Sequence, residues 1–178
     1  DLGGGMGISY LKNEKPMNIK QYAKLINKFL KNKDSKIIFE PGRFIIGNAG
    51  ILITKIIYIK KSNNRNFVIL DAGMNNLMRP ALYNAHHEIV SLKKTGKSLR
   101  GNFKFVGPVC ESSDKFSDKK NFSNIREGEY VALLNVGAYG MSLSSNYNTR
   151  PTIAEVMVSG SKHKIIRKRQ SLENLINN

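Results

Sequence analysis

The spacing of apolar residues along this 178-residue chain changes after about the first 50 positions. Within 18–31 the apolar side chains recur at helical intervals and Asn18 is a suitable N-cap, so we predict a helix there. The short apolar run at 36–39 predicts a buried strand that ends at Glu40. A glycine-rich loop, a helix and a strand in this order are typical of a parallel α/β array. In such arrays, sites gather at the carboxyl ends of the strands.

The remaining residues have a β-like pattern. A long β-like run at 51–60, a polar turn cluster at 62–66 and a second run at 67–70 predict a hairpin. Further strands are predicted at 88–92, 103–109, 130–134, 154–158 and 164–167, a polar surface loop at 115–126, and a short helix at 171–176. The predicted fold class is therefore α/β plus β, with the end of an α/β barrel in residues 1–50 and a mainly β domain in residues 51–178.

Composition narrows the class of protein. The formal net charge is +16, but the lysines are dispersed (Lys31, Lys33, Lys60, Lys61, Lys93, Lys94, Lys119, Lys120), and no aromatic residues alternate with them as a stacking platform requires. We therefore favour a basic surface over a nucleic-acid-binding module. A single cysteine excludes an internal disulfide and fits a reducing compartment, so we expect a cytoplasmic protein. No apolar stretch has the roughly 18 residues of a membrane span.

The tetrapeptide Glu40-Pro41-Gly42-Arg43 places an acid, a tight turn and a fixed cation within four residues. Upstream, Gly3-Gly4-Gly5 would let backbone N–H groups approach a phosphate closely. A carboxylate at a strand end is suited to a ring nitrogen, although Glu40 is equally able to form a salt bridge with Arg43. Together these residues point to a site for a phosphorylated, nitrogen-containing ring and a charged amino acid.

Five further residues have candidate roles. Arg79 and Tyr83 lie four apart and can meet one anion, although Arg79 alone reads as a surface arginine. Cys110 is by default a buried structural thiol, but beside an acid on a Gly-Pro turn it is also a candidate proton donor, and Glu111 suits a substrate ammonium. Tyr139 is either a phosphate ligand or a packing side chain. His86, His87 and His163 have no metal-ligand spacing, so we expect no metal site.

These blocks resemble the pyridoxal-phosphate-dependent amino-acid decarboxylases of the alanine-racemase-like fold, and most closely the diaminopimelate decarboxylases among them. The resemblance rests on five stretches that cover nearly the whole chain in order, at 1–10, 40–43, 71–83, 107–112 and 137–151. It implies a pyridoxal 5'-phosphate-binding (β/α)8 barrel followed by a β-barrel-like or sandwich-like C-terminal domain, with the C-terminal segment of the chain returning to the barrel.

The resemblance also implies a role for each candidate residue. Cofactor contacts are implied for Gly5, Glu40, Pro41, Gly42, Arg43 and Tyr139, with Glu40 near the pyridine nitrogen. Substrate contacts are implied for Arg43, Arg79, Tyr83, Glu111 and Tyr139, and Cys110 is the implied proton donor. Because Cys110 and Glu111 act in the partner subunit's site in this family, a homodimer is implied.

The implied reaction is decarboxylation of meso-2,6-diaminopimelate to L-lysine and CO2, the last step of lysine biosynthesis. The family's Schiff-base lysine has no matching context in this sequence, so we expect the chain to be the C-terminal portion of a longer protein and to be inactive alone. The alternatives are a related ornithine, arginine or carboxynorspermidine decarboxylase, or a catalytically dead homologue that acts as a binding protein. Arg79 and Glu111 favour the dicarboxylic substrate.

Overall fold

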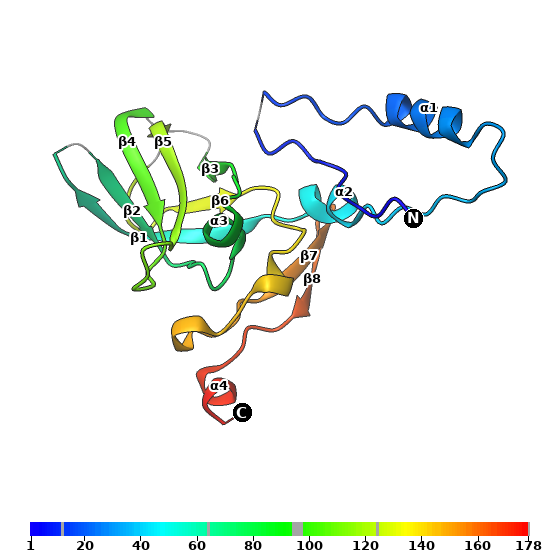
Figure 1. Cartoon of the computed structure of the whole chain (residues 1–178). Helices are drawn as coiled ribbons and strands as arrows, with labels where there is room; N and C mark the ends of the chain where they lie inside the picture. Colours follow the sequence, from blue (N-terminus) through cyan, green and yellow to red (C-terminus); the bar gives the residue numbers. More distant parts are fainter. Residues whose placement is uncertain (12, 64, 94–97, 124, 178) are drawn as a thin grey trace.

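The computed structural model describes residues 1–11, 13–63, 65–93, 98–123 and 125–177. Asn64 of the predicted turn cluster and Lys94 of the dispersed lysines lie outside the described residues. A six-stranded sheet forms the centre of the molecule, and residues 13–41 extend away from it (Figure 1).

The strands of the sheet follow the order β3-β6-β1-β2-β4-β5. Their bounds are β1 (Leu52–Lys61), β2 (Asn66–Leu70), β3 (Ile89–Ser91), β4 (Ser98–Val106), β5 (Lys115–Ser123) and β6 (Tyr130–Leu133). Strands β2 and β4 pair in parallel, and the other neighbouring strands pair antiparallel. The sheet curls on itself in Figure 1, so this part of the chain has a nearly closed, barrel-like form.

One face of the curled sheet encloses the hydrophobic core. Ile56, Leu70, Phe105 and Val131 come from four different strands and are fully buried. The Phe105 ring meets the Phe122 ring edge-to-face, with 4.9 Å between centroids. Burial of each such side chain contributes about 1.5–3 kcal/mol, whereas no described residue of the segment 1–41 is buried.

The predicted surface loop at 115–126 is wrong, because β5 occupies residues Lys115–Ser123. Phe116 and Phe122 of this strand point into the core. Lys115 and Lys120 are exposed, and Lys119 pairs with Glu88 at 2.7 Å. The lysine and aspartate content gives this segment a low β-propensity, so the sequence did not predict a strand. In the folded chain, pairing with β4 and the burial of two rings outweigh that low propensity. The other predicted strands of the β-rich part form within a few residues of their predicted limits.

Residues 1–50 contain α1 (Ile19–Leu30), α2 (Gly42–Ile46) and the 3-10 turn η1 (Gly47–Ala49). The predicted cap of α1 is confirmed, since the Asn18 side chain accepts the Gln21 N–H at 3.0 Å. Leu25 and Phe29 on the apolar face of α1 remain 60% and 59% exposed. A twelve-residue helix is marginal without a packed face, so α1 depends on a surface that the described residues do not supply.

The predicted strand at 36–39 is not a strand in the structure. Its backbone is paired with the N-terminal segment through only two hydrogen bonds, from Leu2 N–H to the Ile38 carbonyl at 3.0 Å and from Glu40 N–H to the Gly3 carbonyl at 2.8 Å. Phe39 contacts Tyr22 of α1 edge-to-face, with 5.9 Å between centroids. Two hydrogen bonds do not make a ladder, although they do place Glu40 beside the glycine-rich loop.

The remaining elements connect and follow the sheet. Helix α3 (Arg79–Tyr83) follows β2, and the 3-10 turns η2 (Met141–Leu143) and η3 (Tyr147–Thr149) follow β6. Strands β7 (Glu155–Ser159) and β8 (Lys162–Arg167) form a separate antiparallel hairpin, and α4 (Leu172–Ile176) ends the described chain, as Figure 1 shows. Among the described residues, no helix is long and apolar enough to cross a membrane.

The chain after α2 approaches the chain after β6 so closely that only glycines fit. Gly137 N–H donates to the Gly47 carbonyl at 3.0 Å, and Val136 N–H donates to the Gly50 carbonyl at 3.0 Å. A Cβ added at Gly137 would collide with the Ile46 carbonyl oxygen, and one added at Gly50 would lie 2.6 Å from Gly137 Cα. This junction holds the segment that carries Glu40 and Arg43 against the sheet.

We therefore expect Gly137→Ala to destabilise the protein, because the new methyl group meets backbone that cannot rotate away. Overpacking of this kind costs roughly 1–3 kcal/mol, which is visible as a lower Tm. Gly7→Ala is the matched control, since a Cβ there meets nothing within 4 Å. Equal melting temperatures for the two variants would show that the junction adapts without strain.

Candidate functional site

The glycine-rich loop and Glu40 lie against each other. Gly3 and Gly5 have φ values of +63° and +75°, a left-handed conformation that costs a non-glycine residue about 1–2 kcal/mol. A Cβ on Gly4 would lie 2.5 Å from the Glu40 carbonyl oxygen, whereas nothing lies within 4 Å of the Gly3 and Gly5 positions. The loop thus presents open backbone next to an exposed carboxylate.

Pro41, Gly42 and Arg43 turn the chain from Glu40 into α2. Gly42 N–H donates back to the Glu40 carbonyl at 2.8 Å, and nothing lies within 4 Å of a Cβ built on Gly42. The four ion pairs found among the described residues do not include one between Glu40 and Arg43. The alternative that Glu40 only forms a salt bridge with Arg43 therefore does not hold, and the charges of both residues remain available to other groups.

Arg79 is not a surface arginine, because it is only 6% exposed. Its Nη1 donates to the Tyr10 hydroxyl at 2.7 Å and lies 3.3 Å from His87 Nε2. Its Cζ lies 5.3 Å from the centroid of the Tyr10 ring and 5.8 Å from that of Tyr139. Helix α3, the N-terminal segment and the loop after β6 thus meet on one guanidinium, whose rotamer is fixed before any ligand binds.

His87 supports Arg79 in a defined tautomer. Its Nδ1 lies 2.9 Å from the Leu134 carbonyl, which can only accept, so Nδ1 carries the proton and Nε2 is an acceptor for Arg79. Burial lowers the pKa of the His87 ring, the hydrogen bond to Leu134 opposes this effect, and the positive charges of Arg79 and His86 lower it further. His87 is therefore a neutral acceptor at neutral pH.

Tyr139 adopts a backbone conformation that its side chain disfavours. Its φ is +61°, in the left-handed region, between Gly137 and Gly140. Such strain costs of order 1–3 kcal/mol and persists only where the surroundings impose it. The side chain is 49% exposed rather than packed in the core, so Tyr139 is not a simple packing tyrosine. Tyr83, four residues after Arg79 on α3, is also exposed.

Cys110 and Glu111 occupy the turn that joins β4 to β5. Both are exposed, so the alternative of a buried structural thiol does not hold for Cys110. The Tyr147 hydroxyl lies 3.3 Å from Glu111 Oε2 and donates to it. The turn is therefore open to solvent, with an acid and a thiol side by side.

The predicted site residues fall into two groups. Arg79 and Tyr139 approach each other. Gly137 joins the loop that carries Tyr139 to the segment with Glu40 and Arg43. In the described part of the chain, no hydrogen bond, ion pair or ring contact links Cys110 or Glu111 to that group. In Figure 1 the β4–β5 turn lies on the opposite side of the sheet from the N-terminal segment and α2.

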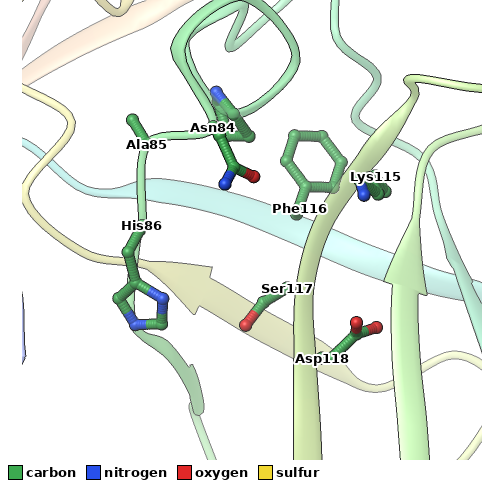
Figure 2. Close-up of a pocket in the computed structure, with 8 residues that line it drawn as sticks. Asn84, Ala85, His86, Lys115, Phe116, Ser117 and Asp118 are labelled. Atoms are coloured by element: carbon green, nitrogen blue, oxygen red, sulfur yellow. The ribbon is translucent and has the colours of Figure 1, made fainter.

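A separate hollow of about 390 Å³ lies between the end of α3 and the start of β5. It is lined by Pro80, Asn84, Ala85, His86, Lys115, Phe116, Ser117 and Asp118, none of which is a predicted site residue. In Figure 2, His86 and Asp118 lie on opposite sides of the hollow and do not converge on one point. We assign it no function.

Sequence reasoning did not single out three residues that organise these groups. Tyr10 and His87 contact Arg79, and Asp114 holds the Cys110–Glu111 turn from within. The only sequence signal for them was an acid or an aromatic side chain close to a motif. Their importance comes from contacts between residues far apart in the chain.

Comparison with known proteins defines the class. Residues 17–137 match the family model described as "Pyridoxal-dependent decarboxylase, C-terminal sheet domain". The chain belongs to this family of pyridoxal-dependent decarboxylases, and its curled sheet is the C-terminal sheet domain of that family.

Several of the similar proteins are diaminopimelate decarboxylases. The chain is 45% identical over 177 residues to the diaminopimelate decarboxylase of Zymomonas mobilis, and 47% identical over 176 residues to that of Haemophilus influenzae. These alignments cover 99% and 98% of this chain and 42% of each relative. The crystal structure of Helicobacter pylori diaminopimelate decarboxylase complexed with L-lysine superposes with a TM-score of 0.89 and 43% identity, covering 98% of this chain and 43% of that one.

Proposed function

We propose that this chain is part of a diaminopimelate decarboxylase, which converts meso-2,6-diaminopimelate to L-lysine and CO2. The observation that carries the proposal is 43–47% identity to enzymes of that name over nearly the whole chain. The chain spans 42% of the length of those relatives. The activity therefore belongs to the full-length protein in which this chain is joined to the remaining part.

The residues present fit pyridoxal 5'-phosphate. Gly3 and Gly5 offer unobstructed backbone, and at Gly4, between them, any Cβ would collide with the Glu40 carbonyl. Glu40, Pro41, Gly42 and Arg43 follow at once, so a phosphate and a ring nitrogen can be held from adjacent segments. When bound, the cofactor withdraws the electron pair that is left when CO2 departs. Glu40 keeps the ring nitrogen protonated, and Gly5, Gly42, Arg43 and Tyr139 hold the phosphate.

The substrate's distal carboxylate binds Arg43, Arg79 and Tyr83. An arginine offers a planar pair of donors that matches a carboxylate, and Arg79 is already oriented by Tyr10 and His87. Tyr139 lies next to Arg79 and reaches both cofactor and substrate. Little side-chain entropy is then lost on binding, because Arg79 is fixed in the free protein.

Cys110 and Glu111 complete a second copy's site. Cys110 delivers the proton to the α-carbon, and Glu111 binds the distal ammonium group of the substrate. Their exposure, and the lack among the described residues of any hydrogen bond, ion pair or ring contact between them and Arg79 or Tyr139, support a homodimer in which each subunit contributes this turn to its partner's site.

Residues 1–50 belong to a (β/α)8 barrel whose other elements lie in the rest of the full-length protein. The uncovered apolar face of α1 supports this division, since Leu25 and Phe29 need a packing partner. The rest of the full-length protein also supplies the lysine that bonds covalently to the cofactor. We place the enzyme in the cytoplasm, where the free thiol of Cys110 remains reduced.

The proposal is tested by genetic complementation. The full-length gene should restore growth without lysine to a bacterium that lacks its own diaminopimelate decarboxylase, and the same gene with Cys110→Ala should not. Failure of the wild-type gene, with the protein present at normal levels, would favour a related diamine decarboxylase or a binding protein without activity.

A further inference from the structure

The turn that carries Cys110 and Glu111 is closed by one buried residue, Asp114. Gly107 N–H donates to the Asp114 carbonyl at 3.0 Å, and Asp114 N–H donates to the Glu111 carbonyl at 3.0 Å. Inside the turn, Glu111 N–H donates to the Val109 carbonyl at 2.8 Å. The main chain of Asp114 thus bounds the turn, while its side chain remains free for other contacts.

The Asp114 carboxylate joins this turn to a second loop. Its Oδ2 accepts the Val109 N–H at 2.8 Å, next to Cys110, and its Oδ1 accepts the Met74 N–H at 2.7 Å. Met74 lies in the loop between β2 and α3, the helix that carries Arg79. One side chain therefore sets the position of the Cys110 turn relative to the loop that leads into α3.

The neighbouring residues confine the Asp114 carboxylate to one position. Asp114 is only 4% exposed. A Cβ on Gly107 would collide with both carboxylate oxygens, and one on Gly73 would lie 3.4 Å from Oδ2. Gly107 therefore makes room for this group, whereas a Cβ on Gly73 would only be in ordinary contact with it.

Burying a carboxylate in order to close a turn is energetically unfavourable. Burial raises the pKa of Asp114, hydrogen bonds from Val109 and Met74 and the charge of Arg150 lower it, and the charge of Glu111 raises it. Taking a charge out of water is costly unless hydrogen bonds compensate for it. Packing alone would be better served by an apolar residue, so the two directed hydrogen bonds are the reason for an acid at this position.

We propose that Asp114 is a positioning residue, which fixes the Cys110 thiol and the Glu111 carboxylate for proton delivery and ammonium binding. This role rests on the proposed function of those two residues. Asp114 itself does not touch substrate or cofactor. It acts by holding the Val109 N–H on one side and the Met74 N–H on the other.

Asp114→Asn in the full-length holoenzyme tests the role. The amide has the shape of the carboxylate, but its NH2 group must face one of the two N–H donors, so that hydrogen bond is replaced by repulsion. We expect kcat to fall and the KM for meso-diaminopimelate to rise, each by about 10- to 100-fold, as for displacements near 1 Å. We also expect the rate at which iodoacetamide alkylates Cys110, followed on its peptide by mass spectrometry, to differ from wild type.

Asp118→Asn is the matched control, an exposed aspartate on β5 that should leave kcat, KM and alkylation unchanged. A merely structural role for Asp114 would lower apparent kcat in proportion to the folded fraction, with KM and the alkylation rate of the folded protein as in wild type. That result would overturn the proposal.

If Asp114→Asn does not fold, Asp114→Glu decides by the same readouts, because it keeps the charge and displaces the oxygens by one methylene. Should the wild-type enzyme fail to act on meso-diaminopimelate, the alkylation comparison still tests the positioning role. An alkylation rate equal to that of Asp118→Asn would then refute it, and a changed rate would support it without the proposed function.

Discussion

We expect Cys110→Ala in the full-length protein to lower kcat for the proposed substrate, meso-diaminopimelate, by about 10²- to 10⁴-fold, the range of a lost general acid. The thiol is exposed on the β4–β5 turn and serves no packing role, so the fold does not depend on it. The absorbance of bound pyridoxal phosphate and the Tm should therefore match those of the wild type. CO2 release measured in assays that are quenched at fixed times, together with the absorbance spectrum and the Tm, checks these expectations.

Ser112→Ala is the control for this variant, since Ser112 is exposed on the same turn, two residues from Cys110. It should retain wild-type kcat. Unchanged turnover in Cys110→Ala would assign the proton to another group and leave the exposed thiol without a role. Loss of the cofactor spectrum would instead point to a structural effect.

We expect Arg79→Ala to raise the KM for the proposed substrate, meso-diaminopimelate, because the distal carboxylate would lose its oriented donors. A hydrogen bond to a charged group contributes about 1.5–3 kcal/mol, which corresponds to roughly 10- to 100-fold in binding. The effect on kcat should be smaller, since the distal carboxylate does not react. Initial-rate kinetics over a range of substrate concentrations separate the two.

Arg79→Ala also removes the contacts to Tyr10 and His87, so its Tm should fall. Arg79→Lys is the more selective variant, because it keeps a charge but loses the planar pair of donors. Arg65→Ala, an exposed arginine in the turn between β1 and β2, is the control and should leave KM unchanged. A KM for Arg79→Lys equal to that of wild type would contradict the carboxylate clamp.

Local rules were sufficient for several elements of the fold. Helix α1 and its Asn18 cap follow from apolar spacing and one polar side chain. The β1–β2 hairpin follows from two apolar runs around a polar turn, and the backbone bond from Ser62 N–H to the Arg65 carbonyl confirms the turn. In these cases neighbours in sequence are also neighbours in space.

Local rules failed where distant partners decide. Strand β5 is too polar to predict, but pairing with β4 and burial of Phe116 and Phe122 make it a strand. The apolar run at 36–39 is not a strand because, among the described residues, only two backbone hydrogen bonds connect it to the N-terminal segment.

The candidate site shows the same division. The motifs suggested Arg79, Cys110 and Tyr139 as candidate site residues, but they did not predict that Arg79 is buried or that Tyr139 has a positive φ. Arg79 is held by Tyr10, 69 residues away in sequence, and the Asp114 carboxylate bonds to Met74, 40 residues away. Such long-range contacts leave no local pattern, so His87 and Asp114 emerge only from the folded chain.

The most direct measurement is the product balance of the purified full-length protein with pyridoxal phosphate and meso-diaminopimelate. We predict CO2 and L-lysine in equal amounts, with ornithine and arginine decarboxylated far more slowly because they have no distal carboxylate for the proposed Arg79 contact. Faster CO2 release from ornithine or arginine, or no release from any of the three by a protein that has bound the cofactor, would contradict this prediction.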